Sequence, residues 1–463
     1  MNGKADCIVR NERKTCLACG APLPEEPLLV LDNMPSSAQN LPKQEELSEE
    51  HGVKLSLNKC PSCGLVQFQC NPVSYYREVI RAVGLSETMR ALRRADYAHL
   101  IETYGLVGKK WIECGCGRGE FLEVLREFPV KIYGTEADQT NADIAHFTLN
   151  RCEGCGSFNP WIAEEEGKKQ RRNIGLCSIL NTFPERADQL LSGGPFDCFL
   201  SFNFLEHQPD PRAMLGCMYT NLRPGGYGLI AVPSFEYILE QGRYYELIRD
   251  HIANYTMDSL RALCQRCGFE VLEAERIGIG DTLRMVVRKP EVGNASEQAQ
   301  RWEEGAAGEA VSSEQVNPRI SDSKAKDAIP EAALTKAGKE AAPLKQHYIQ
   351  FRREIDAYMQ KLKREGRSIA LWGAGHQGFT AAATTALGKN ARYIIDNAAF
   401  KQGKYAPASH LPIVAPEHFL EEPVDVLLIA APGYCREIEA EIRRRYAAYP
   451  GLHICDLNNL QER

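Results

Sequence analysis

The segment KKWIECGCGRGEFLEVLREF, residues 109–128, contains the pattern that decides the fold of this chain. It reads as a short apolar strand, a glycine-rich turn and an amphipathic helix. Glu113 ends the strand, and the glycines follow two apart, at Gly115, Gly117 and Gly119. Glycine permits a tight turn and close approach of the backbone to a ligand, and the helix that follows offers free amide groups at its N-terminus. The segment therefore predicts a nucleotide-like cofactor.

Apolar runs alternate with helical patterns on both sides of this segment, from about residue 75 to residue 289. The runs are VKIYGTE (130–136), FDCFLSF (196–202), GYGLIAV (226–232) and RMVVRK (284–289). This alternation is typical of a parallel α/β sheet with crossover helices. The second run ends at Glu136, where an acidic side chain can accept both ribose hydroxyls of a nucleotide. We therefore expect residues 75–289 to form an α/β domain with Glu136 in its cofactor site.

Two matched cysteine pairs precede this domain. They are Cys16-Leu-Ala-Cys19 and Cys60-Pro-Ser-Cys63, each followed at once by a glycine. A CxxC turn lets both sulfurs reach one ion, so two such turns predict a tetrahedral thiolate site for Zn²⁺. Four protein ligands leave no open position, which indicates a structural site in a small zinc-binding module over residues 14–74. The gap of 40 residues between the pairs is longer than usual and keeps two unrelated pairs of free thiols as the alternative.

Composition excludes several classes of function. The net charge of −6 argues against binding to a nucleic-acid backbone. No apolar run approaches the roughly 18 residues of a membrane helix, and the first residues lack the apolar core of a secretory signal. We therefore expect a cytoplasmic protein with no membrane partner. In such a reducing compartment, the 17 cysteines are expected to be metal ligands and buried thiols rather than disulfides.

A second α/β unit follows a stretch of different composition. Residues 290–343 are rich in Ala, Glu, Ser, Gly and Lys and predict a disordered linker, because they offer little apolar surface to bury. Residues 344–463 then alternate between helix and strand again. Within them, GAGHQG (373–378) follows an apolar strand, and Asp396 ends a later one. This is a formal dinucleotide fingerprint, which is a weak signal when it stands alone.

The order of these parts resembles a known family. The acidic-x-G-x-G-x-G loop is similar to the first motif of class I S-adenosylmethionine-dependent methyltransferases, and FDCFLSFNFLEHQPDP (196–211) resembles their fourth strand and following loop. A zinc module, this core and a C-terminal α/β domain together resemble the C-methyltransferases that act on nucleotide-linked deoxysugars. Further similar segments are LVLDNMPSSA (29–38), LSLNKCPSCGLVQ (55–67), SYYREVIRAVGLSETMR (74–90) and YIIDNAAFKQGKYAPASHLPI (393–413). The last segment contains residues that resemble landmarks of the family: Asp396, Lys401, Gln402, Gly403, Pro412 and Ile413.

The resemblance implies an α/β fold: a class I methyltransferase Rossmann-like core, a small N-terminal zinc module and a second C-terminal Rossmann-like domain. It implies S-adenosylmethionine as the cofactor, with a binding set of Glu113, Gly115, Gly117, Gly119, Glu136 and Asn203. The implied chemistry is abstraction of a proton next to a keto group, after which the enolate carbon attacks the methyl group. His207 matches the family's base, with Glu206 orienting it, and Tyr75 or Tyr76 resembles the family tyrosine near the sugar.

The departures from the family pattern concern the acceptor. Phe204 stands where the sugar enzymes commonly carry a tyrosine, and RDHIANYT (249–256) replaces their His-Glu-His and Tyr-Phe-Thr run. GDTLR (280–284) and AAPGY (430–434) also differ from the family landmarks. The cofactor half is thus intact while the substrate half has changed.

Three alternatives follow from these departures. One is O- or N-methyl transfer to a related sugar or small metabolite. Another is an NAD-dependent oxidoreductase that uses the C-terminal fingerprint. For the C-terminal domain, however, we favour a role in covering the nucleotide end of the acceptor over NAD binding. A zinc scaffold without catalysis is hard to reconcile with an intact cofactor loop. The sequence predicts no oligomeric state.

Overall fold

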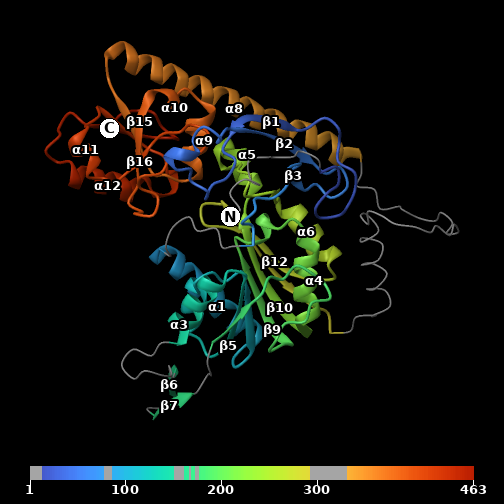
Figure 1. Ribbon diagram of the computed structural model, residues 1–463. Coiled ribbons are helices and arrows are strands. Elements are labelled where there is room, and N and C mark those ends of the chain that lie inside the picture. Colours follow the sequence, from blue (N-terminus) through green and yellow to red (C-terminus); the bar gives the residue numbers. More distant parts are fainter. Residues whose placement is uncertain (1–12, 78–85, 151–160, 166–167, 173–176, 292–330) are drawn as a thin grey trace.

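The computed structural model of the protein describes residues 13–77, 86–150, 161–165, 168–172, 177–291 and 331–463 (Figure 1). These residues form an N-terminal sheet, a central α/β domain and a C-terminal α/β domain. The long helix α8 (Glu331–Glu365) runs across the C-terminal domain and the N-terminal sheet (Figure 1). No helix in the described ranges combines the length and apolar character that a membrane span needs.

The central sheet has the strand order β12-β13-β10-β9-β4-β5-β8. Its strands are parallel except for β13, which runs antiparallel to both β10 and β12. The strand bounds are β4 Lys110–Cys114, β5 Lys131–Glu136, β8 Ser178–Asn181, β9 Phe196–Phe202, β10 Leu222–Pro233, β12 Glu270–Ile277 and β13 Thr282–Arg288. The order reverses between β4 and β9, and ligands of open α/β sheets bind at such a switch point. The predicted class I methyltransferase fold is confirmed.

The helices of this domain begin and end at the signals that the sequence provides. Their bounds are α1 Glu87–Tyr104, α2 Glu120–Leu125, α3 Gln139–Asn150, α4 Pro211–Asn221, α5 Phe235–Gln241 and α6 Met257–Arg266. Ser86 caps α1, and Gly105 ends it in the left-handed conformation. The short strands β6 (Trp161–Glu165) and β7 (Lys168–Arg172) form a separate hairpin. Strand β9 is buried along its whole length, as its largely apolar sequence predicts.

The N-terminal sheet is antiparallel and has the order β1-β2-β3-β11. Its first three strands are β1 (Leu29–Met34), β2 (Val53–Lys59) and β3 (Val66–Phe68). The fourth, β11 (Ala253–Asn254), comes from the central part of the sequence. The N-terminal module is therefore completed by a strand from outside residues 14–74, which sequence reasoning did not anticipate.

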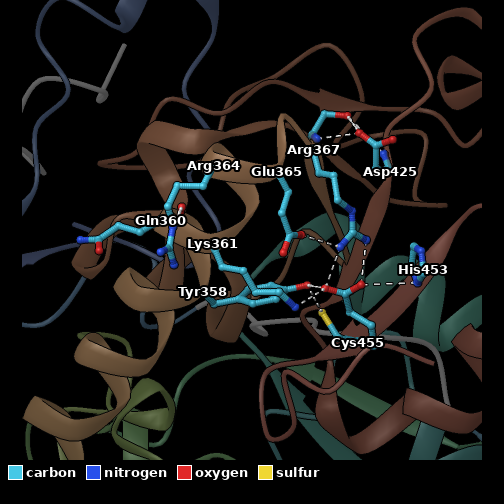
Figure 2. A network of polar contacts seen from close by, with 11 residues as sticks. Tyr358, Gln360, Lys361, Arg364, Glu365, Arg367, Asp425, His453 and Cys455 are labelled. Carbon is cyan, nitrogen blue, oxygen red and sulfur yellow. Dashed lines mark hydrogen bonds and ion pairs between the residues drawn. The ribbon is translucent and has the colours of Figure 1, made fainter.

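The C-terminal domain is a second Rossmann-like unit, as expected, with a parallel sheet in the order β16-β15-β14-β17-β18. The elements are β14 Ile369–Trp372, α9 His376–Thr384, α10 Leu387–Asn390, β15 Ala391–Ile395, β16 Ile413–Val414, α11 His418–Glu421, β17 Val426–Ile429, α12 Cys435–Arg445 and β18 His453–Asp456. Near the end of α8, Tyr358 and Arg367 both donate hydrogen bonds to Glu462, so the helix is tied to the end of the sheet (Figure 2).

Helix α8 corrects the predicted linker. We expected disorder over residues 290–343, but residues 331–343 belong to this helix. The stretch is rich in Ala, Glu and Lys, which have high intrinsic helix propensity. The prediction of disorder rested on the low content of apolar residues and did not take this propensity into account. Leu344 and Tyr348 then pack into the apolar cluster of the N-terminal sheet, which anchors the helix. Residues 292–330 of the predicted linker lie outside the described residues.

The C-terminal domain contacts both other parts of the chain. Glu50 of the N-terminal module accepts hydrogen bonds from the backbone of Ala408 at 2.8 Å and lies 2.8 Å from His410. Glu246 of the central part lies 3.1 Å from His376 and accepts a hydrogen bond from Gln377 at 2.6 Å. These contacts hold the start of α9 over the edge of the central sheet that carries the predicted site.

Candidate active site

The glycine loop joins β4 to α2 in a conformation that needs glycine. Gly115, Gly117 and Gly119 have φ values of 66°, 59° and 84°, in the left-handed region that side chains disfavour. A Cβ atom at Gly115 would also lie 2.4 Å from the ring of Phe204. Both the backbone and the packing therefore require small residues at the position predicted to bind the cofactor.

Glu136 ends β5 beside this loop, as the sequence predicts. Its carboxylate accepts hydrogen bonds from the backbone N–H of Gly117 and of Asp138, both at 2.9 Å. Burial raises the pKa of Glu136 to about 7, although these backbone hydrogen bonds oppose the shift. Each carboxylate oxygen can accept more than one hydrogen bond, so the group still has capacity for ribose hydroxyls.

Two further carboxyl groups lie at neighbouring strand ends without adequate partners. Oε2 of Glu113, at the end of β4, has no hydrogen-bond partner among the described residues, and burial raises its pKa to about 8. Neither oxygen of Glu206, just after β9, has a hydrogen-bond partner in the described part of the chain, and burial again raises the pKa to about 8. Buried carboxyls that lack partners favour a cationic ligand. S-adenosylmethionine, with its sulfonium and ammonium groups, fits this requirement.

His207 lies in a 3-10 turn (Leu205–His207) directly after β9. Its Nδ1 donates a hydrogen bond to the backbone oxygen of Asp250 at 2.7 Å, because a carbonyl can only accept. The tautomer is therefore fixed, with a free lone pair on Nε2. Burial lowers the pKa of His207 to about 4, so the ring is neutral near pH 7. A neutral imidazole with a free Nε2 is able to take a proton.

The described residues show no hydrogen bond through which Glu206 would orient His207, so this expected role stays a prediction. Glu206 Oε1 lies 3.8 Å from His207 Nε2, which is too far for a hydrogen bond. The orienting contact comes instead from Asp250, because only its carbonyl reaches the other ring nitrogen. Glu206 lies next to the nitrogen that would receive a proton. An imidazolium ion formed there would favour the ionised form of the Glu206 carboxyl, and the two charges would stabilise each other.

His251, which lies in the run 249–256 that departs from the family pattern, joins this pair. Its ring centroid lies 4.8 Å from that of His207. One possible ligand atom each from Glu206, His207 and His251 lies within 4.8 Å of the others, so the cluster also has the composition of a metal site. The segment 249–256 was the available signal, because it replaces the family's His-Glu-His run.

The two candidate tyrosines have different surroundings. Tyr75 donates a hydrogen bond to Asp250 Oδ1 at 2.5 Å, which places it next to the residue that holds His207. Tyr76 packs edge-on against Phe183, with ring centroids 5.8 Å apart, and Phe183 packs in turn on Phe204 at the glycine loop. Tyr75 thus lies in the His207 group, whereas Tyr76 belongs to an aromatic cluster on the cofactor side.

Asn203, the remaining predicted cofactor contact, follows β9 with a φ of 47°. Its side chain is exposed, and its backbone N–H donates to Ala231 in the next strand at 2.9 Å. This left-handed residue turns the chain out of the sheet between the glycine loop and the 3-10 turn of His207. It lies at the sheet edge where a cofactor is expected.

A narrow cleft of about 10 Å³, room for about one water molecule, lies beside this group, between the N-terminal module and the C-terminal domain. The residues that line it are Met34, Pro35, Ser37, Ala38, Ile248, Arg249, Asp250, His376, Phe379 and Thr380. Half of them are apolar, and the other half are polar or charged.

The four cysteines predicted to bind zinc converge as expected. Cys16 Sγ lies 3.5 Å from Cys63 Sγ, Cys19 Sγ lies 3.5 Å from Cys60 Sγ, and all four sulfurs lie within 4.8 Å of one another. A disulfide bond would be about 2.05 Å long, whereas sulfurs about 2.3 Å from a central ion have the observed order of spacing. The described residues thus fit a tetrahedral thiolate site.

The other cysteine pairs give no second thiolate cluster within the described ranges. Cys264 and Cys267 are buried in and just after α6, where they pack in the apolar core. Cys152 and Cys155 lie outside the described residues.

In the C-terminal glycine loop, the acid of the dinucleotide fingerprint is paired with other groups of the protein. Asp396 accepts a hydrogen bond from the backbone of Ala374 at 2.8 Å and pairs with Lys401 at 3.2 Å. Glu246 contacts the side chains of His376 and Gln377 at the start of α9, the helix end that faces the pyrophosphate in a dinucleotide complex. The acid of the fingerprint is therefore paired, and a carboxylate lies beside the helix end where an anion would bind.

Two parts of the chain match known families. Residues 89–274 match the methyltransferase domain family, and residues 311–454 match the family of C-methyltransferase C-terminal domains. The second match begins inside the stretch that we expected to be a linker.

Three known proteins illustrate the similarity. C-methyltransferase NovU of Streptomyces niveus is 22% identical over 340 residues, which cover 73% of this chain and 70% of the relative. A ubiquinone biosynthesis O-methyltransferase of Idiomarina loihiensis is 30% identical over 125 residues, 27% of this chain and 42% of the relative. Among solved structures, magnesium protoporphyrin IX methyltransferase from Synechocystis PCC 6803 aligns over 43% of this chain and 79% of that chain, with 12% identity and a TM-score of 0.30.

Proposed function

We propose that this S-adenosylmethionine-dependent methyltransferase, which joins a methyltransferase domain to a C-methyltransferase C-terminal domain, methylates a carbon next to a keto group of a nucleotide-linked deoxysugar. The observation that carries the proposal is His207, a neutral imidazole with a free Nε2 at the switch point of the central sheet. The similarity to a C-methyltransferase over most of the chain supports carbon as the acceptor atom.

His207 is the proposed general base. When bound, S-adenosylmethionine supplies an electrophilic methyl group and leaves as the neutral thioether. His207 Nε2 takes the proton on the carbon next to the keto group, and the electrons of that C–H bond form the enolate, whose carbon then bonds to the methyl group. Asp250 prevents rotation of the ring through its contact with Nδ1. The imidazolium then returns its proton to solvent, which restores the base.

The cofactor is proposed to bind along the edge formed by Glu113, the glycine loop, Glu136 and Asn203. Glu136 would accept the ribose hydroxyls, and the buried carboxyl of Glu113 would favour the positive charge of the cofactor. The C-terminal domain is proposed to cover the nucleotide end of the acceptor. We propose that residues 14–74 act as the zinc module and residues 75–289 as the cofactor domain.

The test uses the protein with methyl-labelled S-adenosylmethionine and a panel of keto-deoxysugar nucleotides. We expect NMR of the product to show the label bonded to carbon. With S-adenosylhomocysteine in place of the methyl donor, the hydrogen next to the keto group should exchange with deuterated water. A label on oxygen or nitrogen, together with no exchange, would reject the proposal.

Methyl transfer to oxygen or nitrogen is the second candidate. It is supported by the similarity of part of the chain to an O-methyltransferase and by Phe204, which replaces a tyrosine of the sugar C-methyltransferase pattern. In that case His207 would remove the proton of a hydroxyl or amine. The position of the label in the NMR experiment separates the two candidates.

A structural zinc ion held by Cys16, Cys19, Cys60 and Cys63 is also proposed. Elemental analysis should find one zinc per chain, and Cys60→Ser together with Cys63→Ser should remove it and destabilise the N-terminal sheet. Cys264→Ser with Cys267→Ser is the matched control, since these buried cysteines form no cluster of four. Retention of zinc after the first change would reject the site. A second bound ion that survives that change would point to Glu206, His207 and His251.

A further inference from the structure

Asp250 lies between the N-terminal module and His207. Its side chain is buried, and both carboxylate oxygens are occupied. Oδ1 accepts a hydrogen bond from Tyr75 at 2.5 Å, and Oδ2 accepts one from the backbone N–H of Ala38 at 3.0 Å. The hydroxyl oxygen of Tyr75 accepts in turn from the backbone of Gln39 at 3.2 Å. The carboxylate is thus fixed by the loop that follows β1.

The backbone of the same residue holds the proposed base. The carbonyl oxygen of Asp250 accepts the Nδ1 hydrogen of His207 at 2.7 Å. Any movement of the Asp250 backbone therefore changes the one hydrogen bond that fixes the histidine tautomer. The side chain and the carbonyl of a single residue join two different parts of the molecule.

The neighbours of Asp250 fasten the same segment to the N-terminal module. Buried Arg249 donates hydrogen bonds to the backbone oxygens of Ser36 at 3.0 Å and Pro72 at 3.1 Å. A few residues later, β11 pairs with β3, the strand that follows the second cysteine pair. The segment is therefore attached to the zinc module on both sides of Asp250.

We propose that Asp250 is a positioning residue through which the N-terminal module sets the tautomer and orientation of His207. This inference rests on the proposed role of His207 as the base. Tyr75 acts through Asp250 rather than on the substrate, because its hydroxyl hydrogen is already donated to the carboxylate. Burial and the charge of Asp250 also raise the pKa of Tyr75, which makes it unsuitable as a base.

The primary test compares Asp250→Asn and Tyr75→Phe with the unaltered protein. Asparagine offers one accepting oxygen and one NH₂ group, so it cannot accept from both Tyr75 and the Ala38 amide. Tyr75→Phe removes one of the two contacts and leaves the carboxylate. We expect kcat to fall about 10- to 100-fold in each variant, because small displacements of a reacting group have effects of this size. Affinity for S-adenosylmethionine should not change.

The second measurement needs no acceptor. Nitrogen NMR of protein labelled in its histidine rings should show His207 protonated on Nδ1 in the unaltered protein and a mixture of tautomers in both variants. If no keto sugar is methylated but the tautomer shifts, the proposed function fails while the positioning role stands. His207 protonated on Nε2 in the unaltered protein would overturn the inference, as would unchanged tautomer and unchanged kcat in both variants.

Two controls separate positioning from a general loss of stability. Tyr358→Phe removes a tyrosine hydroxyl that donates to a carboxylate, Glu462, at 3.0 Å in the C-terminal domain (Figure 2). It should alter neither the His207 signals nor kcat. The double variant of Asp250 and Tyr75 should lose no more activity than the worse single variant, since the two residues act as one unit. Additive losses would contradict the inference. If Asp250→Asn does not fold, Tyr75→Phe decides.

Discussion

The two glycine-rich loops of this chain have the same strand–loop–helix setting but different charges around them. At residues 115–119, the neighbouring acid Glu136 bonds only to backbone amides, and Glu113 keeps an unpaired buried oxygen among the described residues. At residues 373–375, Asp396 is paired with Lys401. The helix after this second loop begins against Glu246.

The difference shows what glycine spacing does and does not indicate. In both loops the glycines allow a strand to turn into a helix, which is a property of the backbone. Binding depends on whether buried charges still need a partner. Around residues 115–119 they favour a cation, whereas around residues 373–375 the protein supplies its own partners. The second loop therefore gives no support to a dinucleotide site.

The largest expected effect tests whether the reaction takes place beside the first of these two loops. His207→Gln should reduce turnover roughly 10²- to 10⁴-fold, the usual contribution of a general base, while affinity for S-adenosylmethionine is kept. The matched control is His453→Gln, at an exposed histidine in the C-terminal sheet, and its turnover should be close to that of the unaltered protein. Steady-state kinetics and calorimetry check both. Full turnover of His207→Gln would move the base to His251 or another group.

The next effect contrasts the two acids that follow the second strand of each domain. Glu136→Ala should weaken S-adenosylmethionine binding by about 1.5 to 3 kcal/mol, more than tenfold, because a charged acceptor is lost. Asp396→Ala should leave this affinity unchanged but lower the free energy of unfolding, because Lys401 loses its partner. Calorimetry and denaturant titration measure the two quantities. Equal affinity in Glu136→Ala and the unaltered protein would rule out the ribose contact.

Much of the fold was predictable because it depends on local patterns. The glycine loop, the acid at Glu136 and the largely apolar run of β9 each carry their signal within a few residues. The CxxC turns are equally local. Pairing between distant segments was not predictable in this way. Strand β11 joins β3 through only two residues, which is too short a stretch to show a strand pattern.

The candidate site shows the same division. Glu113 and Glu136 were identified from their places at strand ends, and His207 from its match to the family's base. The partner of His207 was not, because Asp250 lies 43 residues away and contributes a backbone carbonyl, which every residue possesses. Sequence proximity favoured Glu206 as the orienting residue. Only the packing of the segment around Asp250 against the N-terminal module shows which contact is made.

A smaller effect concerns pH and sharpens the contrast in charge. The pKa values of Glu113 and Glu136 are raised to about 8 and 7, so both carboxyls are partly protonated near pH 7. A bound cation favours the ionised form, so binding of S-adenosylmethionine should release protons. Affinity should rise as pH increases from about 6.5 to 8, by up to about tenfold per pH unit for each proton released.

Calorimetry in two buffers of different ionisation enthalpy measures this proton release. S-adenosylhomocysteine lacks the sulfonium charge and should release fewer protons. Glu113→Gln should flatten the pH dependence, whereas Asp396→Asn in the C-terminal loop should leave it as it is. Affinity that falls as pH rises would show that the buried carboxyls do not interact with the charge of the cofactor.

The smallest expected effect tests the internal contacts around the second loop. Gln377→Ala removes one hydrogen bond to Glu246, which keeps its contact with His376, so the free energy of unfolding should fall by about 1 kcal/mol. S-adenosylmethionine affinity should be unaltered, because neither Gln377 nor Glu246 belongs to the proposed cofactor site. NADH should raise the melting temperature of neither protein, since Glu246 and Lys401 already occupy the charged positions of the loop. A melting temperature raised by NADH would show that NADH binds the folded protein. The internal pairs would then have to open to admit a dinucleotide.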